Sequence, residues 1–334
     1  MKNIIIGCGR IGERHAKHIK TYGHLMAVCD IDKEAANRLA KKYKVPSYYS
    51  IEEMLLGVKD LGIDLISICT PNGLHAEHTI KSLENGLNVL CEKPLAISVN
   101  QASEMLRTAE HFNKRIFAVK QNRFNPPVMK LKSLIEEGVL GEIYSIQLNC
   151  FWNRNEDYYK NTWKGSIELD GGTLYTQFSH FIDLLIWLNG DIIDSKGFAE
   201  NFNHKNNVEF EDTCCFIIRF KNNSIGTINC TINSYSKNME GSITVFGSNG
   251  TIKIGGQYLN TIDYLDINGI EEIELPEGNS ANNYGTYVGS MSNHDKVYEN
   301  VKEVLDGKGI ITTTGFEGYD VVRVIENLYN SICK

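Results

Sequence analysis

Through about residue 120, short apolar or β-branched runs alternate with longer stretches whose apolar residues recur near the helical period. The predicted strands are Asn3–Ile6, Leu25–Cys29, Leu65–Cys69, Leu87–Cys91 and Ile116–Val119. The stretches between them predict helices over Gly12–Tyr22, Lys33–Tyr43, Ile51–Leu56, His75–Asn85 and Val99–Phe112. Strands and helices that alternate in this way form right-handed βαβ crossovers, so we expect a doubly wound α/β fold with a parallel sheet.

The pattern changes after a polar segment that ends in Pro126 and Pro127. Helices are predicted over Val128–Glu137, Leu174–Leu188 and Phe316–Ile332. Strands dominate the rest, at Ile143–Phe151, Cys214–Phe220, Ile225–Ile232, Ser242–Phe246, Thr251–Ile254, Thr261–Ile267 and Glu271–Leu275. Short Asn/Gly turns between them indicate an antiparallel sheet. We therefore expect two domains, 1–122 and an α+β domain 123–334 with a large open, mostly antiparallel sheet, whose last helix 316–332 can pack back on the first domain.

The composition excludes several classes of protein. The 334 residues include 34 basic and 41 acidic side chains, a net charge of −7, so nucleic acid and anionic membranes are not expected as partners. No apolar run approaches the roughly 18 residues of a membrane span. The N-terminus lacks the pattern of a signal peptide and no CxxC pair occurs, so we expect a cytoplasmic protein with no metal site. Reduced core thiols are predicted at Cys8, Cys29, Cys69, Cys91, Cys150, Cys215 and Cys230.

A glycine-rich segment, Gly7–Gly12, follows the first predicted strand in the pattern Gly-x-Gly-x-x-Gly and opens the first predicted helix. The pyrophosphate of a dinucleotide can lie on backbone N–H groups at such a helix N-terminus. Asp30 follows the second strand, where its carboxylate would accept hydrogen bonds from the adenosine ribose. Because Asp30 would repel a 2′-phosphate and no Arg or Lys directly follows it, NAD is favoured over NADP. The first domain is therefore predicted to be a Rossmann dinucleotide-binding domain.

Two further polar segments leave the ends of predicted strands, where ligands bind in an open α/β sheet. They are Thr70-Pro71-Asn72-Gly73-Leu74-His75 and Glu92-Lys93-Pro94. Together with the segment Thr314–Gly318, they resemble the signature of the Gfo/Idh/MocA oxidoreductases, and the resemblance extends over essentially the whole chain. It implies a nicotinamide-binding domain followed by a domain for substrate binding and oligomerisation.

This resemblance also implies roles for individual residues. Lys93 is the active-site lysine, Glu92 and Asn72 contact the nicotinamide half of NAD, and Pro94 follows a cis peptide bond. An ammonium beside a reacting hydroxyl stabilises negative charge as the proton leaves, which fits a catalytic Lys93. The residues assigned to NAD are Gly7, Gly9, Arg10, Ile11, Gly12, Asp30, Thr70, Asn72, His75, Glu92, Lys93 and Gln121.

The second half of the catalytic apparatus is expected in the segment Asp170–Asp183, where the family has a glycine-rich turn before Asp-x-x-x-His on one helix face. This chain keeps the histidine, His180, and has Thr176 in place of the aspartate. The missing carboxylate makes dehydrogenases of simple polyols poorer models. His180 is the best candidate for the general base, since an imidazole can accept the proton of a secondary alcohol near neutral pH. The alternative is a histidine that only packs in the core.

The segments Asn149–Arg154, Tyr158–Lys160 and Trp163–Gly165 resemble one branch of the family, the WlbA/WbpB-type dehydrogenases of UDP-N-acetylglucosaminuronate. The branch implies oxidation of the C3 hydroxyl of such a nucleotide sugar to a ketone in surface polysaccharide (lipopolysaccharide) biosynthesis. Some members recycle the cofactor with 2-oxoglutarate. A diphosphate and a carboxylate suit cationic side chains among aromatic rings, so the predicted substrate-binding residues are Arg154, Lys160, Thr176 and Gln177.

Three other interpretations are open: a dehydrogenase of another sugar or cyclitol, an NAD-dependent glycosidase that oxidises C3 transiently, and a non-catalytic NAD-binding sensor. The retention of Lys93 and His180 argues against the sensor. The open sheet of the second domain has no second layer of helices to cover it, so we expect a homodimer or homotetramer. His15 and His18, on the first predicted helix, are given surface or packing roles.

Overall fold

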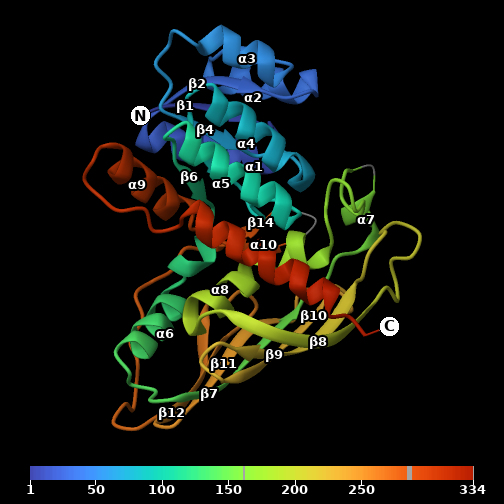
Figure 1. The fold of residues 1–334 in the computed structure, drawn as a ribbon, viewed down its shortest axis with the longest axis vertical. Helices are drawn as coiled ribbons and strands as arrows, with labels where there is room; N and C mark the ends of the chain where they lie inside the picture. Colours follow the sequence, from blue (N-terminus) through green and yellow to red (C-terminus); the bar gives the residue numbers. More distant parts are fainter. Residues whose placement is uncertain (161, 284–287, 334) are drawn as a thin grey trace. The chain divides into compact units, whose positions relative to one another are not determined.

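The computed structural model describes residues 1–160, 162–283 and 288–333 (Figure 1). The chain forms two compact units. The first consists of Met1–Lys120 with His294–Arg323, and the second of Gln121–Asn293 with Val324–Lys334. The boundary falls within the long helix α10 (Gly315–Asn330), whose N-terminal part belongs to the first unit.

A six-stranded parallel sheet forms the centre of the first unit, in the order β3-β2-β1-β4-β5-β6. Its strands are β1 (Lys2–Ile6), β2 (His24–Cys29), β3 (Ser47–Tyr48), β4 (Leu65–Ile68), β5 (Asn88–Cys91) and β6 (Ile116–Ala118). This is the Rossmann order, in which the direction of winding reverses between β1 and β4. Ligands of such sheets bind at this reversal, beyond the carboxyl ends of the strands.

Helices cover this sheet (Figure 1): α1 (Arg10–Tyr22), α2 (Lys33–Tyr43), α3 (Ile51–Val58), α4 (His75–Glu84), α5 (Val99–His111) and α9 (His294–Leu305). α1 packs against α9, and α4 packs against α5. The side chains of Asp32 and Ser50 accept hydrogen bonds from the first N–H groups of α2 and α3, which fixes where these helices begin. On α1 the buried positions include Gly12 and His15, one turn apart.

The second unit is built on a seven-stranded sheet in the order β13-β12-β11-β7-β10-β9-β8. Neighbouring strands are antiparallel except for β7 and β10. The strands are β7 (Ile143–Phe151), β8 (Ile192–Glu200), β9 (Thr213–Phe220), β10 (Ile225–Thr231), β11 (Glu240–Gly247), β12 (Gly250–Gly255) and β13 (Thr261–Ile267). α6 (Pro126–Glu136) contacts β12, and α8 (Ser179–Asn189) contacts β7. The Rossmann sheet and this second sheet confirm the predicted fold class.

One face of the seven-stranded sheet is open. Along β9, Phe216 and Ile218 are buried, whereas Cys215 and Ile217 are exposed, because successive side chains of a strand point to opposite faces. The neighbouring strands add the exposed Phe198 to the same face, since it pairs directly with Cys215. The expectation that Cys215 is a core thiol is therefore wrong. All nine cysteines are free.

Several elements differ from the sequence prediction. Glu271–Leu275 is not a strand; it is rich in glutamates and precedes Pro276, a composition that disfavours a strand ladder. The helix expected from Leu174 begins with a π-helical turn, η3 (Leu174–Phe178). β3 and β8 were not predicted. The shorter elements are η1 (Asn72–Leu74), η2 (Gln121–Phe124), α7 (Glu156–Tyr159), β14 (Ala281–Asn283) and β15 (Val288–Met291). Within the described ranges, no helix combines the length and the apolar character needed to cross a bilayer.

Candidate functional site

The turn between β1 and α1 has the shape that a dinucleotide phosphate requires. Gly7 has a φ of +94°, and a Cβ on Gly7 or Gly12 would collide with the backbone of Cys69 or of Gly7. A Cβ on Gly9 would meet nothing, so space lies in front of the turn. The N-cap of α1 is Gly9, which has no side chain to accept from the N–H groups of the first turn. These features fit the pyrophosphate of NAD.

Asp30 is fixed at the carboxyl end of β2, facing the glycine turn. Its Oδ2 accepts a hydrogen bond from the backbone N–H of Cys8 at 2.6 Å, and its Oδ1 accepts one from the N–H of Asp32 at 2.9 Å. The two amides orient the carboxylate while leaving it further lone pairs for hydroxyl donors. This arrangement fits the ribose contact that the sequence assigns to Asp30.

The segments after β4 and β5 are tied together by His75. One ring nitrogen of His75 lies 2.6 Å from the carbonyl oxygen of Pro94, and the other lies 2.9 Å from that of Thr70. The Lys93–Pro94 peptide bond is cis, as predicted. Asn72 is buried in η1 within the same segment. His75 therefore contacts the backbone on both sides and shapes the strand-end loops.

Glu92 lies in a buried cluster that the sequence analysis did not foresee. Its Oε1 is 2.8 Å from Nε2 of His15 and 3.1 Å from Nε2 of His294, and its Oε2 accepts from the N–H of Lys93 at 3.1 Å. Burial by itself would raise the pKa of Glu92, but the hydrogen bonds from both histidines hold it well below its ordinary value. Glu92 is therefore a carboxylate at neutral pH.

The helix that carries His180 starts at a tight glycine turn in the second unit. Gly172 has a φ of +132°, and a Cβ there would collide with the hydroxyl of Tyr329. The backbone N–H of Gly165 donates to Oδ2 of Asp170 at 2.8 Å, which closes the loop before the turn. The π-helical turn η3 then leads into α8; such turns are frequent at functional sites.

Gln121 and His180 meet within the second unit. Both side chains are buried, and their Nε2 atoms lie 3.3 Å apart. Nε2 of Gln121 also donates to Oγ of Ser290 at 3.4 Å. The structure thus brings Gln121, assigned to NAD from the sequence, to the predicted general base.

Arg154 is the centre of a second polar cluster in this unit. Its side chain is buried, with Nε donating to Oε1 of Gln177 at 2.9 Å and Nη1 donating to Oδ1 of Asn238 at 3.2 Å. The guanidinium lies 4.9 Å from the ring centroid of Trp152 and 5.3 Å from that of Tyr158. Such packing holds a planar cation in one orientation, ready for an anionic group.

Two other predicted substrate-binding residues lie in different surroundings. The hydroxyl of Thr176 donates to the backbone carbonyl of Asp170 at 3.2 Å. The side chain of Lys160 is 72% exposed, and its ammonium is 3.9 Å from Asp157. Lys164 lies 4.6 Å from the ring centroid of Tyr158, so it contacts the Arg154 cluster.

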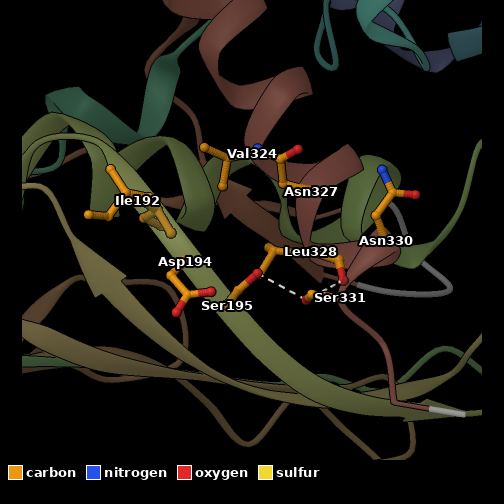
Figure 2. Close-up of a pocket in the computed structure, with 9 residues that line it drawn as sticks. Ile192, Asp194, Ser195, Val324, Asn327, Leu328, Asn330 and Ser331 are labelled. Carbon is orange, nitrogen blue, oxygen red and sulfur yellow. Dashed lines mark hydrogen bonds between the residues drawn. The ribbon is translucent and has the colours of Figure 1, made fainter.

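The predicted residues divide between the two units. The NAD residues from Gly7 to Lys93 belong to the first unit; Gln121, Arg154, Lys160, Thr176, Gln177 and His180 belong to the second. A groove of about 350 Å³ also lies in the second unit, between β8 and the end of α10 (Figure 2). Ser195 and Ser331 line it and hydrogen bond to each other at 2.9 Å. It contains none of the predicted site residues.

Family models match both parts of the chain. Residues 1–120 match the oxidoreductase family with an NAD-binding Rossmann fold, and residues 132–334 match the C-terminal alpha/beta domain of the same family. The chain therefore belongs to the Gfo/Idh/MocA oxidoreductase family, as the sequence motifs predicted. Its first unit is an NAD-binding Rossmann domain.

Solved structures of two WlbA dehydrogenases, each in complex with NADH and UDP-GlcNAcA, resemble the whole chain. The protein from Chromobacterium violaceum is 29% identical with a TM-score of 0.89, covering 99% of this chain and 93% of that one. The protein from Bordetella pertussis is 30% identical with a TM-score of 0.88, covering 99% and 96%. These similarities agree with the branch that the sequence resembles.

A curated relative points to related chemistry on another sugar. The D-glucoside 3-dehydrogenase of Escherichia coli is 40% identical over 144 residues. The match spans 42% of this chain and 40% of the length of that relative. It therefore supports the family more than it supports a substrate.

Proposed function

We propose that this protein is an NAD-dependent dehydrogenase that oxidises the C3 hydroxyl of a UDP-N-acetylglucosaminuronate-like nucleotide sugar to a 3-keto sugar. Its place would be in surface polysaccharide biosynthesis. The observation that carries the proposal is the buried Arg154, held by Gln177 and stacked between aromatic rings. A guanidinium in a fixed orientation can form two parallel hydrogen bonds with a carboxylate or a phosphate, the groups that this substrate has and a free polyol lacks.

Gln177 connects this cluster to the predicted base. Gln177 accepts from Arg154 through Oε1 and donates through Nε2 to the hydroxyl of Tyr158 at 2.8 Å. His180 follows Gln177 by three residues in the same helical segment. The residue that orients Arg154 and the predicted base are thereby carried by one helical segment, which favours the positioning of a sugar for reaction at a single hydroxyl.

The residues would act as follows. His180 takes the proton of the C3 hydroxyl, and the ammonium of Lys93 stabilises the oxyanion that develops. NAD, when bound on the glycine turn and Asp30, supplies the hydride acceptor. The substrate loses one proton from oxygen and one hydride from C3, and the product is a ketone.

The test is mass spectrometry of UDP-N-acetylglucosaminuronate incubated with the full chain, NAD and 2-oxoglutarate. Oxidation removes two hydrogens, so the wild type should lower the substrate mass by about two units. A matched Lys93→Ala variant should lose turnover by roughly 10²–10³-fold, the range for removing a group that stabilises a developing oxyanion, and should still bind NAD. A substrate that stays unchanged beside protein saturated with NAD would reject this nucleotide sugar.

A second candidate is the 3-dehydrogenation of a glucoside, which the partial match to the Escherichia coli enzyme favours. Both reactions remove hydride from C3 of a glucose-like ring, so a panel with matched concentrations of nucleotide sugar and alkyl glucoside separates them. Release of the aglycone in place of a keto sugar would identify the NAD-dependent glycosidase. Dependence of turnover on 2-oxoglutarate would show that this acid reoxidises the cofactor.

A further inference from the structure

His15, Glu92 and His294 place three potential metal ligands together inside the first unit. They come from α1, the end of β5 and the start of α9. One ligand atom from each residue lies within 4.8 Å of the other two. The donors of one tetrahedral zinc ion lie roughly 3.3 Å apart, because zinc–nitrogen and zinc–oxygen bonds are about 2.0–2.1 Å long. The observed 2.8 and 3.1 Å from Glu92 to the histidines are close to that value.

The burial and charge of the cluster suit a cation. His15 is 0%, His294 2% and Glu92 6% exposed. A carboxylate and two imidazoles, all buried, can together offer three ligand atoms and a negative charge to a divalent cation.

The surroundings of His15 also match those of a metal-binding histidine. Its Nδ1 lies 2.7 Å from the hydroxyl of Tyr298, which in turn is 2.8 Å from Oγ of Ser67. Histidine ligands usually hold the ring with a hydrogen bond from the second nitrogen. When Nε2 of His15 gives its lone pair to a metal, Nδ1 carries the proton and its N–H donates a hydrogen bond to the hydroxyl of Tyr298.

Hydrogen bonds to Glu92 do not satisfy every group of the cluster. Nδ1 of His294 is buried and has no hydrogen-bond partner among the described residues. The ring of His294 also stacks on that of His18, with centroids 6.2 Å apart. The rings are therefore held in place by packing, and Nε2 of His294 keeps its aim at Glu92 whichever nitrogen carries the proton.

We propose that His15, Glu92 and His294 form a binding site for a divalent transition-metal ion of the zinc type, with water as the fourth ligand. Two imidazoles and one carboxylate are a donor set that zinc prefers. An occupied site ties α1 to α9 and fixes Glu92, next to Lys93. Metal binding at this site requires no particular sugar substrate, so it is tested independently of the function proposed above.

Titration with Co²⁺ tests the site, because tetrahedral Co²⁺ absorbs visible light where the hydrated ion absorbs weakly. The full chain would be used in a Cys215→Ser/Cys333→Ser background, which removes the two exposed thiols, after dialysis against a chelator. We expect one equivalent of Co²⁺ with tetrahedral bands, displacement by Zn²⁺ and a rise in Tm on Zn²⁺ binding. Tyr298→Phe should bind roughly 10-fold more weakly, since it removes the partner of a ligand.

His294→Gln should abolish the bands, whereas His111→Gln, at an exposed histidine, should keep them. Glu92→Gln, which preserves shape, serves as a second variant, and circular dichroism shows whether each variant is folded. Absence of stoichiometric Co²⁺ binding in the wild-type cluster overturns the proposal. So does equal binding by folded His294→Gln or Glu92→Gln.

Discussion

The Nε2 atoms of Gln121 and His180 face each other at 3.3 Å in the interior of the second unit. With the amide nitrogen of Gln121 facing His180, its N–H donates and the ring nitrogen accepts through a lone pair. That is the neutral imidazole, the form in which a histidine accepts a proton. Gln121 therefore stabilises His180 in the state that the proposed reaction needs at its start.

Gln121→Glu should shift the pH dependence of the reaction. A carboxylate beside His180 favours the imidazolium, so a higher pH is needed to free the base. We expect the acidic limb of kcat/KM to move to higher pH and the activity at pH 7 to fall. Gln121→Leu is the uncharged control, whose limb should move less than that of Gln121→Glu because no carboxylate then faces His180. If the pH profile of Gln121→Glu coincides with that of wild type, residue 121 does not influence the protonation of the catalytic base.

Arg154→Lys tests the anion contact. A lysine keeps the charge but loses the planar fork and the stacking on Trp152 and Tyr158. Hydrogen bonds to charged groups contribute about 1.5–3 kcal/mol, so KM for the nucleotide sugar should rise roughly 10–100-fold, with kcat less affected. Lys160→Ala, at the exposed lysine of the same region, should change KM little. A rise of equal size for Lys160→Ala would return Lys160 to the substrate-binding residues.

Much of the fold could be predicted because local signals determine it. Lys33–Tyr43 and Ile143–Phe151 were predicted with the observed bounds. Asp32 caps the helix, and the buried positions of the strand alternate from Ile146 to Cys150. The edge strand β8 was missed. Its segment, Ile192–Glu200, is largely exposed and polar, and it gains a strand conformation by pairing with β9, a contact that the sequence of the segment does not encode.

The candidate site divides in the same way. Asp30 and the glycine turn lie within one βαβ unit, so motif spacing was enough to predict a cofactor role for them. His15 could have been recognised because it lies one turn after Gly12 on the buried face of α1. His294 could not, since its contact with Glu92 joins positions 202 residues apart. Only the tertiary fold brings these two side chains together.

Ile217→Lys tests whether the open sheet face is an interface between copies of this chain. Ile217 is 63% exposed, and Phe198 on the adjacent strand is 70% exposed. Burying such a face would drive association, and a lysine on it would oppose association. Light scattering should show a dimer or tetramer for wild type and a smaller species for the variant. Ile310→Lys, at an exposed isoleucine of the first unit, is the control. A monomeric wild type would contradict the expected assembly.

Glu211 provides a prediction about stability. It is buried in the second unit, where the hydroxyl of Tyr329 donates to its Oε1 at 2.8 Å and also accepts from the N–H of Leu174 at 3.2 Å. Burial raises the pKa of Glu211 from 4.5 to about 7, although the Tyr329 hydrogen bond lowers it. Glu211 and Tyr329 therefore hold the glycine turn before His180 in place. Because Glu211 is buried there, ionisation of its carboxyl destabilises the folded chain.

The sign of the effect follows from proton uptake. Between pH 4.5 and about 7 the folded chain keeps a proton on Glu211 that the unfolded chain has lost, so stability falls as the pH rises through this window. The full penalty, about 3 kcal/mol, is present above pH 7. Glu211→Gln keeps the shape and the acceptor for Tyr329 without the charge. Its Tm should match wild type near pH 4.5 and exceed it at pH 8, whereas Glu104→Gln, at an exposed site, should follow wild type throughout. Calorimetry measures the difference in Tm between Glu211→Gln and wild type at both pH values. If this difference is the same at pH 4.5 and at pH 8, the carboxyl of Glu211 ionises alike in the folded and unfolded chain.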